Sequence, residues 1–142
     1  MGAREKDLNP DTFIGLKLPL GYSDSGYFKQ TTTTLQQAKY NILNLLKTIP
    51  GERLGQPLFG SKLHQLLFEP MNDDFTEVVE ESIRSSMETW LPYINIKKIK
   101  VAIPNYNVNR VNIDVDFGLS FEPDRFESIT VSFDQFESSI KE

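Results

Sequence analysis

With 142 residues, 39% of them hydrophobic, and a net charge of −5 at pH 7, the chain is long enough to bury one core, and a single domain is expected. It has no cysteine, which excludes disulfide bonds, thiolate catalysis and cysteine-ligated zinc and is compatible with folding in a reducing cytoplasm. No apolar run is long enough to span a membrane, and no N-terminal segment has the pattern of a secretion signal. We therefore expect a soluble protein that is not exported and does not bind membranes.

The excess negative charge lies in the second half of the chain. Residues 1–70 carry eight Lys or Arg against six Asp or Glu, whereas residues 71–142 carry seven against fourteen. The acidic half would repel nucleic acid, and the basic residues elsewhere are scattered rather than arranged in a stripe. We expect no nucleic-acid binding, and a basic protein surface is the more natural partner.

Residues 1–33 contain many residues that interrupt helices and strands. Pro10, Pro19, Gly15, Gly21 and Gly26 fall among serines and aspartates, which opposes long regular elements. The stretch FIGLKLPLGY at positions 13–22 is nevertheless too apolar for a simple linker. We expect an irregular N-terminal arm over residues 1–33, followed by one domain over residues 34–142. The arm is either flexible or, as we favour, a segment that becomes ordered on assembly.

The first predicted helix follows a run of four threonines, Thr31 to Thr34, which can supply its N-cap. Its apolar residues recur at steps of three and four, the spacing of a single helix face. Pro50 disfavours helical geometry at Ile49 and marks the end of the helix. The apolar face comprises Leu35, Ala38, Ile42, Leu45, Leu46 and Ile49.

The stretch from Ile49 to Pro70 begins with glycines and prolines spaced too densely for any regular element. We predict a shaped loop that presents two opposite charges, Glu52 and Arg53. The same loop presents an apolar plug made by Leu58 and Phe59.

Two further helices are predicted after this loop. A short leucine-rich helix begins with Ser61 as its N-cap. A longer helix ends at Pro92 and opens at Asp73 or Asp74, the second of which has capping-box spacing to Glu77. Its apolar face comprises Phe75, Val78, Val79, Ile83, Met87 and Trp90.

From Ile94 the spacing of apolar residues changes from helical to alternating, which indicates β-strands. The first strand reaches Ile103. Its phase breaks between Ile96 and Ile99, so we expect an irregularity or β-bulge there. A predicted turn over Pro104–Asn109 leads to the second strand.

The second strand is the most regular stretch of the chain, because every second residue from Val111 to Phe121 is apolar. It forms a β-hairpin with the first strand. A third candidate strand, Ile129 to Phe133, follows a predicted turn at Glu122–Arg125. Three helices packed on one face of this small antiparallel sheet give an α+β domain.

The second strand also offers a candidate docking surface. Asn112, Asp114 and Asp116 would lie on the sheet face that the helices leave open. A sheet this small has exposed edges, and an unpaired edge of the Val111–Phe121 strand could accept a strand from another protein that bears Lys or Arg. The alternative is that the third strand or the acidic tail covers that edge.

Three motifs occur in order around the loop: GER at positions 51–53, PLFG at 57–60 and LxxLLFEP at 63–70. In this order and spacing they resemble the small baseplate wedge or sheath-initiator family of contractile phage tails, which also has a member in the type VI secretion baseplate. The downstream helix and strand patterns are similar too. The resemblance covers Thr31 to about Phe133.

The resemblance implies a structural part of the virion, located in the tail baseplate in several symmetric copies and made in the host cytoplasm. Such proteins join wedge proteins to the central hub, and they initiate the sheath by accepting a β-strand of the sheath protein. Many members have Glu-Pro-Arg at the end of the third helix; the different residues found here imply an apolar or aromatic contact instead. The implied contact residues are Gly51, Glu52, Arg53, Pro57, Phe59, Gly60, Leu91, Pro92, Tyr93, Asn112, Asp114 and Asp116.

Two other functional classes stay open, a cell-wall glycosidase and a free-standing adaptor domain. The glycosidase is considered because family members have been labelled lysozyme-like. Glycoside hydrolysis needs two carboxylates across a cleft. Glu52 is followed by Arg53, which favours an ion pair over a general acid. His64 is the only histidine, which is too few for an ordinary histidine metal site and argues against a catalytic triad. We expect no catalytic residue, metal or cofactor; the acids near the loop are Glu52, Glu69, Asp73 and Asp74.

Overall fold

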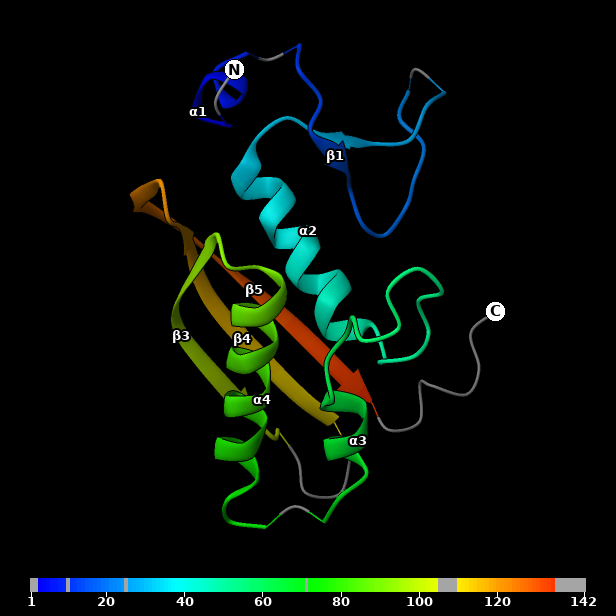
Figure 1. Ribbon diagram of the computed structural model, residues 1–142, viewed down its shortest axis with the longest axis vertical. Helices are drawn as coiled ribbons and strands as arrows, with labels where there is room; N and C mark the ends of the chain where they lie inside the picture. Colours follow the sequence, from blue (N-terminus) through cyan, green and yellow to red (C-terminus); the bar gives the residue numbers. More distant parts are fainter. Residues whose placement is uncertain (1–2, 10, 25, 71, 105–109, 135–142) are drawn as a thin grey trace.

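The computed structural model describes residues 3–9, 11–24, 26–70, 72–104 and 110–134. Helices α2 and α4 lie against one face of a three-stranded antiparallel sheet (Figure 1), which confirms the α+β class. The described elements, in chain order, are α1 (Ala3–Asp7), β1 (Gly15–Leu16), β2 (Gln30–Thr31), α2 (Thr34–Lys47), α3 (Leu63–Leu67), α4 (Phe75–Trp90), β3 (Ile94–Ala102), β4 (Arg110–Leu119) and β5 (Glu122–Asp134).

Helix α2 begins and ends close to its predicted bounds. Thr33 is the N-cap, and its hydroxyl oxygen accepts a hydrogen bond from the Gln36 N–H at 3.3 Å. The helix ends at Lys47, shortly before Pro50, with Thr48 as the C-cap. Its core-facing residues are buried as predicted: Leu35, Ala38, Ile42, Leu45 and Leu46.

The prediction that Ser61 caps α3 is wrong. Lys62 takes the N-cap position and makes no side-chain capping bond. Ser61 is buried instead, and its hydroxyl donates to the carbonyl oxygen of Leu46 at 2.9 Å. The serine therefore satisfies a carbonyl left free at the end of α2 rather than an N–H at the start of α3.

Helix α4 starts after Asp74, but the predicted capping box does not form. Asp74 already has helical backbone angles (φ −85, ψ −1), and its side chain makes no capping hydrogen bond. Val78, predicted to be buried, is 48% exposed. The core face of α4 is narrower than predicted and consists of Phe75, Val79, Ile83 and Met87.

The strand order β3-β4-β5 places β4 in the centre of the sheet. Asn112 of β4, for example, lies opposite Ala102 of β3 and Ser132 of β5. The prediction of an unpaired edge on this strand is therefore wrong. The alternative, in which the third strand covers that edge, is confirmed.

Strand β5 is longer than predicted, and the predicted turn at Glu122–Arg125 is wrong because these residues belong to the strand. The chain reverses at Ser120 and Phe121 instead, so β4 ends at Leu119. Leu119 pairs with Glu122 while the preceding Gly118 pairs with Phe126, which leaves residues 123–125 outside the pairing. Such a bulge accommodates a proline and charged side chains without ending the strand.

The predicted irregularity in β3 is confirmed by a register shift between Ile96 and Lys98. Of the predicted turn at Pro104–Asn109, residues 105–109 lie outside the described residues.

The described N-terminal residues contact the start of α2. The Asp7 carboxylate accepts hydrogen bonds from the backbone N–H and the hydroxyl of Thr34, both at 2.8 Å. Thr31 of β2 is fully buried, and its hydroxyl donates to the Gln37 side chain at 2.7 Å. Within the described part of the chain, no helix is long and apolar enough to cross a membrane.

Candidate partner-binding surfaces

The loop between α2 and α3, residues 48–62, is named here the GER loop after Gly51, Glu52 and Arg53. Gly51 has φ 101, and its N–H donates to the carbonyl oxygen of Pro57 at 2.7 Å, which closes the loop across its base. The Glu52 carboxylate accepts a hydrogen bond from the Ile49 N–H at 3.1 Å. Glu52 therefore fixes the turn that follows α2, in place of the predicted pairing with Arg53.

Arg53 has an aromatic partner. Its guanidinium carbon lies 4.3 Å from the ring centroid of Phe59, a cation–π contact. The Phe59 ring is buried and meets Trp90 edge to face, with 5.2 Å between centroids. The stack of Arg53, Phe59 and Trp90 joins the GER loop to the end of α4, so Phe59 is the predicted plug while Leu58 stays 79% exposed.

Gly60 lies where the GER loop crosses the end of α2. It is buried with φ 135, and a Cβ built on it would lie 2.5 Å from the carbonyl oxygen of Thr48. The next residue, Ser61, donates its N–H to that same oxygen at 3.0 Å. Only glycine allows this close approach of two backbone segments. Gly60 therefore shapes the loop and offers no side chain to a partner.

In the Leu91-Pro92-Tyr93 segment, two of the three residues make their contacts within the domain. Leu91 is buried in the core, so it presents no contact surface. The Tyr93 hydroxyl accepts a hydrogen bond from Asn41 of α2 at 2.7 Å, and the Tyr93 carbonyl accepts from the Ser120 N–H at 3.1 Å. Pro92 is the exposed residue of the three.

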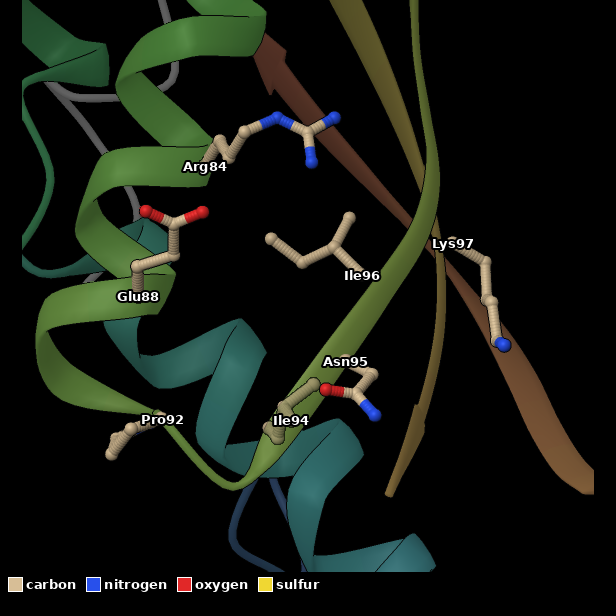
Figure 2. Close-up of a pocket in the computed structure, with 7 residues that line it drawn as sticks. All are labelled: Arg84, Glu88, Pro92, Ile94, Asn95, Ile96 and Lys97. Atoms are coloured by element: carbon tan, nitrogen blue, oxygen red, sulfur yellow. The ribbon is translucent and has the colours of Figure 1, made fainter. Parts of the chain in front are cut away.

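A cleft of about 440 Å³ lies beside Pro92, between α4 and β3. Figure 2 shows Arg84 and Glu88 of α4 reaching toward the Ile96 side chain of β3. Neither charge was predicted as a contact residue from the sequence, although the two lie four residues apart on α4 and so share one face of that helix. Arg84 is already paired with Glu80 of the same helix at 3.2 Å. The apolar or aromatic contact expected at Pro92 stays a prediction.

On the open face of the sheet, the acidic residues have partners within the sheet. Asp114 accepts a hydrogen bond from the Thr130 hydroxyl at 2.6 Å and lies opposite Lys100 in β3. Asp116 lies opposite Lys98. Lysines of β3 therefore stand beside the aspartates, where the sequence suggested that the Lys or Arg of an added strand would lie. Among the described residues there is no cluster of three or more His, Cys, Asp or Glu that could hold a metal ion.

Comparison with known proteins gives a consistent result. Residues 33–124 match the model of a family described as baseplate wedge protein gp25. Baseplate wedge protein gp25 of Enterobacteria phage T4 is 30% identical over 95 residues, which is 67% of this chain and 71% of that protein.

Two solved structures have a similar fold. A Geobacter sulfurreducens protein provisionally named a tail lysozyme has a TM-score of 0.67 at 20% identity, covering 77% of this chain and 97% of that one. A chain of the anti-feeding prophage baseplate has a TM-score of 0.57 at 18% identity, covering 84% and 83%. At these identities the two structures support the fold alone.

Proposed function

The chain belongs to the baseplate wedge protein gp25 family, and from this membership we propose that it is a structural component of a contractile-tail baseplate. In this proposal it is present in several symmetric copies, joins wedge proteins to the central hub and initiates the sheath by accepting a β-strand of the sheath protein. The GER loop and the region of Pro92 contact the wedge proteins, and an edge of the sheet receives the sheath.

The observation that carries sheath initiation is the free edge of β5. This strand pairs with β4 on one side and has no second partner among the described strands. Beyond Pro123 it continues without proline to Asp134. Alternate backbone groups on its outer side are therefore available to an added strand.

The other free edge, on β3, is a poorer acceptor. The register shift between Ile96 and Lys98 breaks its hydrogen-bonding row, and Lys97, Lys98 and Lys100 are all exposed. Bulges and lysines are the usual means by which an edge strand avoids pairing. We assign the sheath strand to β5 for this reason.

The absence of cysteine allows this assignment to be tested by single-cysteine cross-linking. Ser132→Cys on β5 and Ala102→Cys on β3 form a matched pair, because both residues lie opposite Asn112 on either side of β4. Cysteines are scanned along the terminal arms of the sheath protein. Ser132→Cys is expected to form a disulfide with one position of one arm, the residue directly opposite it in the added strand, and not with the residues on either side of that position, whose side chains point to the other face.

The Ala102→Cys control is expected to form no disulfide with either arm. Cross-links from Ala102→Cys alone would move the docking edge to β3. Cross-links from neither residue, although sheath and baseplate bind one another, would contradict strand addition.

The structure gives no support to a role for Glu52 in glycoside hydrolysis. Its carboxylate is used to fix an exposed backbone turn. The purified protein is expected to release no soluble fragments from peptidoglycan, and Glu52→Gln is expected to behave identically. Release of fragments that disappears in Glu52→Gln would establish the glycosidase alternative.

A further inference from the structure

An open apolar groove of about 530 Å³ runs between the GER loop and α4, separate from the cleft beside Pro92. Leu58 of the GER loop and Leu66 of α3 line one side, and Val78 of α4 lines the other. Trp90, which holds the Arg53 and Phe59 stack, lies at one end. The groove therefore joins apolar side chains from three consecutive segments of the chain.

Much of this apolar surface faces solvent. Leu58 is 79% exposed, Val78 is 48% exposed, and Leu54 in the same loop is fully exposed. The loop that carries both leucines is closed by the bond from Gly51 to Pro57. Apolar side chains held in place before binding lose little conformational entropy when a partner covers them.

The geometry of α4 favours a helix as the occupant. The residues of α4 that line the groove extend from Val78 to Trp90, a length of about 18 Å at the rise of an α-helix. The α4 backbone is already hydrogen-bonded within the helix and cannot pair with an added strand. An occupant in an apolar groove must satisfy its own backbone groups, and a helix does so.

The charges around the groove favour a helix with basic side chains along one flank. Glu81 lines the groove, and Glu77 is exposed one turn earlier on α4. Lys62 is the basic residue in the lining. Asp73 and Asp74 extend the acidic side beyond the start of the helix. Basic side chains on the flank of the incoming helix would complement this row.

We infer that this groove binds an amphipathic helix of a neighbouring wedge protein, with its apolar face on Leu58 and Val78 and Lys or Arg beside Glu77 and Glu81. The identity of the partner as a wedge protein rests on the proposed function. The existence of a helical, basic-flanked occupant rests on the groove itself.

The test uses the full chain co-expressed with the wedge proteins of the same tail. Ser85 is exposed and lines the groove, so Ser85→Arg fills the groove without disturbing the core. Thr76→Arg is the control, since Thr76 is exposed on the same helix, lies outside the groove lining and gives the same change in charge. Ser85→Arg is expected to raise the Kd for the wedge complex about tenfold or more, and Thr76→Arg less than about twofold.

A photo-cross-linking residue at position 85 then identifies the occupant. The expected products are partner residues spaced three or four apart, with Lys or Arg nearby in that sequence. Equal affinities for the two arginine variants, or cross-links at every second partner residue, would overturn the inference and leave the proposed function standing. If the wild-type chain bound no wedge protein, the proposed function would fail together with the inference. Melting curves of both variants confirm that the comparison is between folded proteins.

Discussion

Gly60→Ala is expected to lower the free energy of unfolding by about 3 kcal/mol, the sum of left-handed backbone strain and a steric clash. The strain comes from the φ of 135, and the clash comes from the Thr48 carbonyl oxygen, 2.5 Å from the added Cβ. The Thr48 carbonyl oxygen cannot move away from the added Cβ, because Thr48 caps α2 and this oxygen accepts the hydrogen bond from Ser61. Thermal melts should show a decrease in Tm of roughly 10 °C.

Two other glycines of the same loop provide graded controls. Gly51 has φ 101 but open space where a Cβ would go, so Gly51→Ala carries the backbone strain alone, about 1–2 kcal/mol. Gly55 has neither a left-handed φ nor a neighbour within 4 Å, so its replacement by alanine is expected to change stability by less than about 1 kcal/mol. Equal melting temperatures for all three variants would contradict the close crossing at Gly60.

Asp114→Pro is expected to prevent stable folding, with a cost above about 3 kcal/mol. Asp114 pairs with Lys100 on one side and Thr130 on the other, so proline removes a donor and introduces a ring in the middle of the sheet. Asp114→Asn is the control, because its amide oxygen can still accept the bond from the Thr130 hydroxyl. Circular dichroism and thermal melts measure both variants.

A folded Asp114→Pro protein with an unchanged melting temperature would mean that β4 lies at an edge of the sheet. That outcome would restore the arrangement that the sequence alone favours. It would also remove the reason for assigning the sheath strand to β5.

The wrong prediction of an unpaired edge on β4 shows what a local sequence pattern can and cannot predict. The alternation from Val111 to Leu119 predicts a strand with one buried face, and the structure confirms it. Alternation says nothing about how many neighbours a strand has. The third strand was predicted, but its start and its pairing with β4 were not. Pro123 and three charges suggest a turn, whereas the structure includes residues 123–125 in a bulge.

For the contact surfaces, too, local features were predicted and contacts between distant residues were not. The glycine and proline spacing predicts a shaped loop at residues 49–60, because those residues act through their own backbone. The groups that Glu52, Arg53 and Ser61 contact within the chain were not predicted, because each depends on which group lies nearby after folding. Tyr93 is similar, since its bond to Asn41 joins residues that are 52 positions apart.

Electron microscopy of assembled tails tests the central claim most directly. Cells express all the tail proteins of the particle with or without this chain, and the fraction of tail tubes that carry a sheath is counted. If the chain is a baseplate wedge component that initiates the sheath, its omission should leave tubes without sheath, and its re-expression should restore sheathed tails. Sheathed tails with complete baseplates at an unchanged yield in its absence would contradict the account.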